Sequence, residues 1–372
     1  MSISSRPLAV LLGGAFPKPG TMPGTWGRVL GSLMDSEVFR GQASFRPYRK
    51  SLPGEGRFLK RSLLDAVRFL EGLRPRPDLL HLHVVFRRSL YREAPLIFAA
   101  RRLGLPVLAD IRTGGLQYAV AHEHTRFEND LLWHALKEAD ALSVECEDDR
   151  IFVEGEVHKP VHVFPNTLSE SVFERITPAG MRLQTGEPLK LVYTGRYIRE
   201  KGLATWLEAM RCLSEEGIPV ELHLIGKGDD AALNAAIASM VNNPPPHVRL
   251  VDHGWFEGEL FELLAGQHVF CLVSSWPSEG HPFSLLEAMA AGLALIVSPW
   301  RHQPYLMPRA HAYLALPDDV ASLVHAVRHY AEAPHGLVEA GAASREFVRE
   351  HFLDSVTYPR LLDVYRDLAG RK

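Results

Sequence analysis

Two glutamates stand eight positions apart in the stretch 274–299. Glu279 lies in a loop rich in proline and glycine, and Glu287 lies in a helix that we expect to begin near Phe283. The backbone N–H groups of 283–285 would point out of the start of that helix, where the helix dipole favours an anion. Carboxylates would repel a phosphate bound there, so we expect the glutamates to bind hydroxyls, one on a sugar and the other on a ribose.

A basic cluster follows the strand expected at 189–194. Arg196 and Lys201 lie in the segment 195–202, from which both can reach a diphosphate at the carboxyl end of that strand. Arginine offers a planar fork and lysine a point charge, a pair that suits a diphosphate leaving group. The chain contains no D-x-D sequence that would bridge Mg²⁺ to a nucleotide. The pattern therefore predicts a metal-free site in which cations and a helix N-terminus stabilise the departing charge.

Short apolar runs alternate with helical patterns along the whole chain, which is typical of doubly wound α/β domains. Most of the runs are continuous rather than alternating, as in strands of a parallel sheet buried on both faces. We expect strands at 8–12, 79–85, 106–111, 141–146, 161–164, 189–194, 220–225, 248–252, 268–274 and 294–298. Helical periods lie at 58–73, 204–216, 259–264 and 320–330.

The strand–helix pattern starts again near residue 189, after a polar segment with proline and glycine. We therefore expect a first domain at 1–168, a linker at 169–188 and a second domain at 189–354. A last helix in 355–372 is expected to be able to pack back on the first domain. A ligand would sit in the cleft between the domains, at the carboxyl ends of the strands.

The composition excludes several classes of protein. With 372 residues, 23% charged and 46% hydrophobic, the chain is globular rather than disordered or fibrous. No apolar run reaches the roughly 18 residues of a membrane helix, and a net charge of −3 gives no general attraction to nucleic acid. The 3 cysteines lie far apart, which favours a reduced, cytoplasmic protein. The weakly apolar start at 6–16 is expected to be a buried strand with a glycine turn rather than a signal peptide.

The motifs of the second half occur in a distinctive order, and this order carries a family resemblance. It runs through 195–202, Leu224 to Gly228, Gly254, Glu279-Gly280, 286–290 and Gly292. The set resembles the C-terminal domain of retaining glycosyltransferases of family 4, the glycosyl transferases group 1, whose hallmark is two glutamates separated by seven residues. The resemblance implies the GT-B fold, with two doubly wound, Rossmann-like domains facing a central cleft.

The first domain resembles the family more loosely. Gly13-Gly14 ends the first strand like the family's glycine loop near the acceptor, and the strand at 78–83 ends in histidines. Two departures affect the expected acceptor and sugar contacts. Arg112 stands where many members have a histidine, and the segment 300–304, WRHQP, replaces a Gly-Ile-Pro-Glu-like sequence.

The sequence thus predicts a cytoplasmic, metal-independent, retaining glycosyltransferase. It would move a hexose-like sugar from a nucleotide diphosphate sugar to an acceptor hydroxyl, in the synthesis of a cell-surface polysaccharide or glycoconjugate. No cofactor is expected beyond the donor substrate. The predicted catalytic residues are Glu279, Arg196 and Lys201; the donor-binding residues are Glu287, Gly280, His281, Phe283, Ser284, Leu285 and Gly195; the acceptor-side residues are Gly13, Gly14, His83 and Arg112.

Other functions remain open at this point. One is a different GT-B enzyme, such as a nucleotide-sugar epimerase or an inverting transferase. Another is a nucleotide-sugar-binding subunit without turnover. An NAD-dependent enzyme is disfavoured, because no G-x-G-x-x-G follows the first strand. The acceptor would be a glycan or a lipid-linked sugar.

A membrane contact is a further open alternative. Residues 1–100 carry 16 Lys/Arg against 7 Asp/Glu, which suits an anionic surface at the inner face of the membrane. The helical segment 58–73 is both basic and amphipathic. We expect it nevertheless to be an ordinary helix whose apolar face covers the sheet. The histidines, including His81 beside His83 and the pair His122 and His124, are not expected to bind metal.

Overall fold

The computed structural model describes residues 6–16, 25–51, 56–87, 89–180, 183, 186–255, 260–301 and 303–370. Glu259, His302 and residues 181, 182, 184 and 185 of the predicted linker lie outside the described residues. The chain divides into two compact units. Unit 1 comprises Met1–Glu170 and Leu353–Lys372, and unit 2 comprises Ser171–Phe352. The division falls inside the segment that the sequence marked as a linker.

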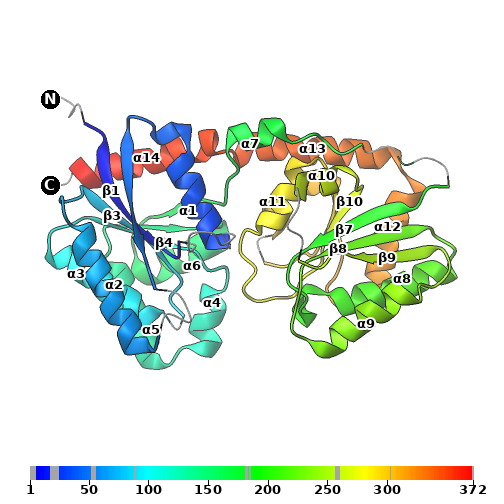
Figure 1. Cartoon of the computed structure of the whole chain (residues 1–372), viewed down its shortest axis with the longest axis horizontal. Coiled ribbons are helices and arrows are strands. Elements are labelled where there is room, and N and C mark those ends of the chain that lie inside the picture. Colours follow the sequence, from blue (N-terminus) through cyan, green and yellow to red (C-terminus); the bar gives the residue numbers. More distant parts are fainter. Residues whose placement is uncertain are drawn as a thin grey trace. The chain divides into compact units, whose positions relative to one another are not determined.

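Unit 1 is built on six parallel strands in the order β2-β1-β3-β4-β5-β6 (Figure 1). The strands β3 (Leu79–Val84), β4 (Val107–Ile111) and β5 (Ala141–Val144) are buried at every residue, as their continuous apolar runs predicted. The remaining strands are β1 (Leu8–Gly14), β2 (Ala43–Arg49) and β6 (Val161–Val163). The strand order reverses between β1 and β3, so the loops at the carboxyl ends of these strands border a crevice.

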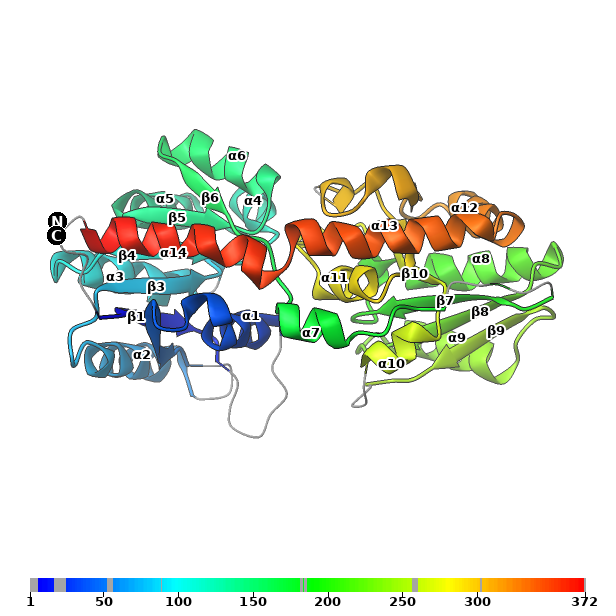
Figure 2. The same ribbon diagram turned by 90° about the horizontal axis from the view of Figure 1, so that it is seen from above.

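Helices lie on both faces of this sheet (Figures 1 and 2). Figure 1 shows α2, α3 and α5 along one face and α14 along the other. The helices are α1 (Thr25–Asp35), α2 (Phe58–Gly72), α3 (Leu90–Arg102), α4 (Leu116–Tyr118), α5 (Arg126–Glu138), α6 (Glu147–Val157) and α14 (Asp354–Gly370). In the part of the chain that the structure describes, no helix combines the length and apolar character needed to cross a bilayer.

Helix α14 completes unit 1, although it follows all of unit 2 in the sequence. The ring of Phe39 lies 5.3 Å from that of Tyr358 and 5.9 Å from that of Tyr365, both on α14. Asp354 anchors the start of the helix, because its carboxylate accepts hydrogen bonds from Ser36 Oγ at 2.7 Å and the Glu170 N–H at 3.0 Å. The last helix therefore packs on the first domain.

Unit 2 is a second sheet of six parallel strands, in the order β12-β11-β10-β7-β8-β9. The strands are β7 (Leu189–Thr194), β8 (Val220–Ile225), β9 (Val248–Asp252), β10 (Val269–Leu272), β11 (Ala294–Val297) and β12 (Ala312–Leu314). The helices are α7 (Glu170–Arg175), α8 (Leu203–Glu215), α9 (Ala231–Asn242), α10 (Leu260–Ala265), α11 (Phe283–Ala290), α12 (Val320–Glu332) and α13 (His335–His351). Its switch point lies between β7 and β10.

Helix α2 overturns the expectation that its apolar face covers the sheet. Asp65, Phe69 and Gly72 are its buried residues. Three of its four leucines point outward instead, with Leu59 80%, Leu63 65% and Leu70 57% exposed, whereas Leu64 is half-buried. The helix lies close to β1 at Gly72, where an added Cβ would come within 2.7 Å of a Leu11 methyl group, so a narrow side of the helix suffices to cover the sheet.

Candidate active site

The candidate site lies at the carboxyl edge of the unit 2 sheet, at the switch point between β7 and β10. Val269 and Phe270 of β10 pair with Leu191 and Val192 of β7, so the loops that follow these strands emerge side by side. Two hydrogen bonds join the loops, because the Glu200 carbonyl accepts from the Ser275 N–H at 2.8 Å and from Ser274 Oγ at 3.1 Å. The two predicted motifs, 78 positions apart in sequence, therefore meet.

Lys201 and Glu279 form an ion pair across these two loops. Their side chains are only 9% and 5% exposed, so both charges are almost wholly removed from water. Each charge is costly to bury by itself, and the contact between them offsets that cost. From the sequence, both residues were predicted to lie at one site, with Lys201 binding the diphosphate and Glu279 binding hydroxyls. Their direct pairing was not predicted.

Glycine is required beside this ion pair. Gly202 has φ +74°, and a Cβ added to it would lie 2.3 Å from the Val273 carbonyl oxygen. A side chain at this position would both strain the backbone and push apart the two loops. Gly202 therefore allows the β7 loop to approach the β10 loop closely enough for Lys201 to reach Glu279.

Trp276 is a site residue that the sequence analysis missed. The Arg196 guanidinium lies 4.4 Å from the centroid of the Trp276 ring, and Lys201 Nζ lies 5.1 Å from it. Both cations are thus held by the face of one aromatic ring. The only sequence signal was an aromatic residue just before the proline of the loop. Arg196 is exposed, unlike Lys201, so it is the cation that solvent or a ligand reaches directly.

Tyr193 fixes the backbone beneath Arg196. Its hydroxyl donates a hydrogen bond of 2.6 Å to the Arg196 carbonyl oxygen. Burial, reinforced by the nearby Glu279 carboxylate, raises the pKa of Tyr193, so the phenol stays protonated and keeps donating. Gly195 lies between the two residues and holds no side chain over the site.

At the start of α11, one of the three backbone amides predicted to bind an anion is already hydrogen-bonded within the protein. The Leu285 N–H donates to the Pro282 carbonyl oxygen at 3.1 Å, so this amide is already engaged. Phe283 and Ser284, the other two positions of the prediction, lie in the first turn of the same helix. Glu287 lies on the same helix and is buried, with 6% of its surface exposed.

His281 lies in the interior of unit 2, beside Gly280 in the loop after β10. It is 2% exposed, and its ring centroid lies 4.6 Å from that of Phe352. The imidazole thus packs within the unit, at a position where the sequence predicted donor binding.

The segment 300–304, which departs from the family pattern, braces the loop that carries Glu279. The Trp300 indole N–H donates to the Trp276 carbonyl oxygen, and the Arg301 guanidinium donates to the Pro277 carbonyl oxygen, both at 3.0 Å. Ser298 Oγ, just before this segment, accepts from the Ser274 N–H at 3.1 Å. Two residues that depart from the family pattern, Trp300 and Arg301, therefore hold the loop that carries Glu279.

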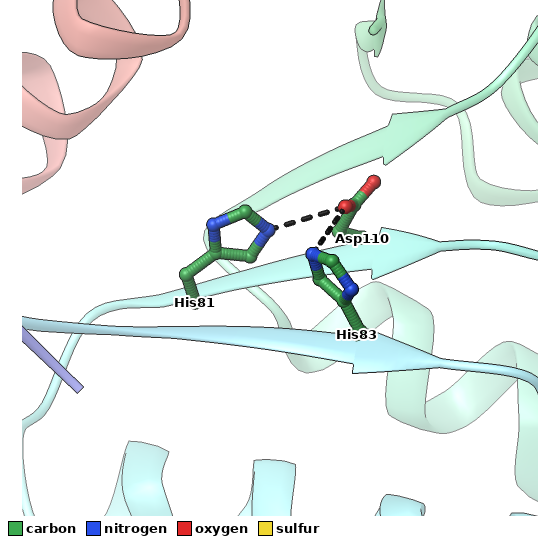
Figure 3. A group of neighbouring side chains, drawn as sticks. All are labelled: His81, His83 and Asp110. Carbon is green, nitrogen blue, oxygen red and sulfur yellow. Dashed lines mark hydrogen bonds and ion pairs between the residues drawn. The ribbon is translucent and has the colours of Figure 1, made fainter. Parts of the chain in front are cut away.

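A buried polar cluster lies near the carboxyl edge of the unit 1 sheet (Figure 3). His81 Nε2 and His83 Nε2 lie 3.2 Å and 3.0 Å from Asp110 Oδ2, and Figure 3 shows both rings turned toward this carboxylate. Arg112 Nε donates to the same oxygen at 2.8 Å. The structure thus brings together His83 and Arg112, two of the four predicted acceptor-side residues, through Asp110, which the sequence analysis missed.

The charges of this cluster are set by burial and by the arginine. Burial alone would raise the pKa of the Asp110 carboxyl, but Arg112 and the two histidines outweigh it and hold that pKa well below its usual range. Burial lowers the pKa of His83 to about 4 against the opposing effect of Asp110, so His83 is neutral near pH 7. Asp110 is therefore an anion, and Arg112 is its counter-ion.

His81, His83 and Asp110 also have the side-chain types and spacing of a metal site, with donor atoms within 4.8 Å of one another. The Asp110 carboxylate is already used, because Arg112 occupies Oδ2 and Ser143 Oγ donates to Oδ1 at 2.7 Å. A metal ion on Oδ2 would have to displace a buried guanidinium of the same charge sign. The residues fit a hydrogen-bonded network better than a metal centre.

Gly13 and Gly14 lie at the end of β1 and are tightly packed. A Cβ on Gly13 would come within 2.6 Å of a Leu82 methyl group, and one on Gly14 within 2.6 Å of a Leu30 methyl group. These two glycines therefore let the carboxyl end of β1 pack closely against Leu82 and Leu30.

Comparisons with known proteins support the resemblance of unit 2 to a glycosyltransferase domain. Residues 188–333 match the family model described as Glycosyl transferases group 1. This range contains Arg196, Lys201, Glu279 and Glu287, so the predicted resemblance to the glycosyl transferases group 1 is confirmed for residues 188–333. A relative is the amylovoran biosynthesis glycosyltransferase AmsK of Erwinia amylovora, which is 30% identical over 189 residues. The match spans 49% of this chain and 46% of AmsK, so the chain spans about half the length of this relative.

Solved structures extend the likeness to the whole chain. Sucrose-phosphate synthase from Thermosynechococcus elongatus has a TM-score of 0.77 at 17% identity, covering 98% of this chain and 100% of that one. The HepE protein of Anabaena in complex with UDP has a TM-score of 0.71 at 14% identity, covering 97% and 100%. At these identities the likeness concerns the fold. The two doubly wound parallel sheets match GT-B structures, which confirms the predicted fold class.

Proposed function

We propose that this chain is a metal-independent, retaining glycosyltransferase that moves a hexose-like sugar from a nucleotide diphosphate sugar to an acceptor hydroxyl. The observation that carries the proposal is the buried Lys201–Glu279 pair at the switch point of the unit 2 sheet, with Arg196 beside it. Open α/β sheets bind ligands at such points. The pair lies inside the range that matches Glycosyl transferases group 1.

Each site residue then has a role that follows from its surroundings. Arg196 is the exposed cation and binds the diphosphate, with Trp276 holding its guanidinium in place. The start of α11 adds its dipole to the same charge. Glu287 holds the ribose hydroxyls. Glu279 binds the hydroxyls of the donor sugar, and Lys201 fixes the direction of the Glu279 carboxylate.

In the reaction, the anomeric carbon exchanges its bond to phosphate for a bond to the acceptor oxygen. The acceptor hydroxyl loses its proton, the nucleoside diphosphate leaves, and the product keeps the anomeric configuration. Negative charge grows on the diphosphate as its bond to the sugar breaks. Arg196 and Lys201 stabilise this charge, and such preorganised electrostatic stabilisation is commonly the largest contribution to catalysis.

The named relatives suggest the setting. AmsK is named for amylovoran biosynthesis, and the HepE structure contains UDP. We therefore propose a role in the synthesis of a cell-surface polysaccharide or glycoconjugate, with a glycan or lipid-linked acceptor. The reaction would take place in the cytoplasm, and UDP-sugars are the first donors to test.

The test begins with a thermal-shift screen of UDP-, GDP- and ADP-sugars, because a ligand at a hundredfold excess over its Kd stabilises the fold by about 2.7 kcal/mol. Transfer is then measured as nucleoside diphosphate released in the presence of candidate acceptors. Arg196→Ala should lower the rate by about a hundredfold or more while leaving the protein folded. The matched control is Arg199→Ala, because the Arg199 side chain is 77% exposed and pairs with Asp230 away from Trp276.

Three results would contradict the proposal. Equal turnover in Arg196→Ala and the wild type would remove the assigned role of the cation. Conversion of the donor without any acceptor would indicate an epimerase. Binding of a donor without transfer to any acceptor would indicate a nucleotide-sugar-binding subunit.

A further inference from the structure

The outer side of α2 is a continuous apolar stripe. Leu59, Leu63, Ala66, Val67 and Leu70 are all exposed. At about 100° per residue, these five positions fall within a sector of about 100°, which is a complete apolar face of a helix. The buried side of α2 lies in a different sector, so this face does not cover the sheet.

Aromatic side chains from two neighbouring helices extend the stripe. The ring of Phe58, at the start of α2, lies 6.5 Å from the ring of Tyr91 on α3. Tyr91 in turn stacks at 6.5 Å on Phe127 of α5. The three rings are 45%, 41% and 65% exposed. We define the α2 surface as the stripe together with these rings, namely Phe58, Leu59, Leu63, Ala66, Val67, Leu70, Tyr91 and Phe127.

Basic residues border the α2 surface. Arg57 and Lys60 are exposed at the start of α2, and Arg126 is exposed beside Phe127. The acidic residues of α2 do little to balance them, because Asp65 is buried and paired with Arg92 at 2.8 Å, which leaves Glu71. The surface therefore combines apolar side chains with a positively charged edge at the start of α2, in a region whose first hundred residues carry a balance of +9. Beside Phe127 the charge of Arg126 is accompanied by that of Glu128, which interacts with Tyr91.

We propose that the α2 surface docks this protein on the surface of an anionic lipid bilayer, with α2 lying parallel to the bilayer plane. A helix with a strong apolar face and flanking Lys/Arg binds in this way, with its apolar side chains about 5–10 Å into the boundary between headgroups and acyl chains. The aromatic rings suit the same depth, and the basic side chains stay among the anionic headgroups.

A second copy of the chain suits the α2 surface less well. Stable protein interfaces use about 20–30 residues from each partner, whereas the α2 surface has eight. A symmetric partner would also bring the same basic edges near each other, where like charges repel. A bilayer has no such size requirement, and its charge is complementary.

The test uses the full-length chain and needs no donor, so its outcome is independent of the transferase assay. Vesicles of phosphatidylcholine, with and without phosphatidylglycerol, are sedimented with the protein at low and moderate salt. The wild type should bind the anionic vesicles and be partly released by salt. Leu59→Asp/Leu63→Asp should lower the partition coefficient by about tenfold or more.

The matched control is Leu103→Asp/Ile151→Asp, which adds the same charges at unit 1 positions that are 46% and 59% exposed but outside the α2 surface. It should bind like the wild type. Arg57→Gln/Lys60→Gln should weaken binding at low salt, because it removes two exposed charges. All these side chains are exposed, so the urea midpoints of the variants should match that of the wild type.

The proposal is overturned if the wild type does not bind anionic vesicles, or binds neutral ones equally well. It is also overturned if Leu59→Asp/Leu63→Asp binds like the wild type, or if the control loses as much binding. A wild-type dimer in sedimentation velocity that becomes a monomer in Leu59→Asp/Leu63→Asp would identify a second copy of the chain as the occupant instead.

Discussion

Replacing Lys201 with methionine should cost both stability and activity, for reasons that can be separated. The ion pair of Lys201 with Glu279 is 9% and 5% exposed, so the variant leaves an almost fully buried carboxylate without its counter-ion. Removing one partner of such a pair typically costs about 3–5 kcal/mol. For a unit of this size, about 4 kcal/mol corresponds to a fall in Tm of roughly 10 °C.

The double variant Lys201→Met/Glu279→Gln separates the two effects. It removes both charges and keeps the approximate volumes, so it should recover most of the lost stability. It should not recover transfer, because the Lys201 charge that stabilises the diphosphate and the Glu279 carboxylate that binds the sugar hydroxyls are both lost. We expect a rate at least about a hundredfold below that of the wild type.

The assays are urea unfolding, followed by circular dichroism, and release of nucleoside diphosphate. Arg199→Met is the control, since it changes a neighbouring cation that is 77% exposed. A stability of Lys201→Met within about 1 kcal/mol of the wild type would refute the reasoning about burial. Full activity of the double variant would refute the catalytic assignment of the pair.

Three further predictions concern metal, pH and backbone. Transfer should survive EDTA, and activity lost in EDTA and restored by Mg²⁺ or Mn²⁺ would contradict the metal-free site. The unfolded chain protonates His83 near pH 6.5, whereas the folded chain does so only near pH 4, so unfolding takes up a proton between these values. Stability should therefore fall by about 3 kcal/mol as the pH drops from 6.5 to 4, and His83→Gln should flatten this slope in urea titrations. Gly202→Ala should lower the urea midpoint of unfolding more than Gly217→Ala does. Both glycines have positive φ, but only a Cβ at Gly202 would meet a carbonyl oxygen, that of Val273, at 2.3 Å. Equal effects of the two substitutions would show that this close approach costs no stability.

The buried strands were predictable because both faces of their sheets are covered. A strand such as β4, buried at every residue, leaves a continuous apolar run in the sequence. The edge strand β2 escaped prediction because its residues are mostly half-buried or exposed and it contains Pro47, a residue tolerated at sheet edges. Periodicity also shows that α2 has an apolar face, but only the packing shows that this face points outward.

The site was predictable as two motifs but not as a set of contacts. The position of Glu279 after a strand indicated the correct sheet edge, and so did the position of Lys201. Their pairing depends on the loop approach that Gly202 allows, which sequence spacing does not reveal. Trp276 was missed because its partner Arg196 lies 80 positions away in sequence. Asp110 was missed because the histidines that it contacts lie on another strand, with His81 29 positions away, although Arg112 is a near neighbour.

The docking of α14 on unit 1 has a consequence for synthesis on the ribosome. The chain leaves unit 1 at Glu170 and returns at Leu353, where Leu168 and Leu353 form a bridge and the Asp354 carboxylate accepts from the Glu170 N–H. All of unit 2 is therefore translated before unit 1 has the helix that supplies Tyr365 to His81. Until then, the part of the first unit's sheet that α14 covers stays exposed, while the second unit already has its whole sequence and can fold first.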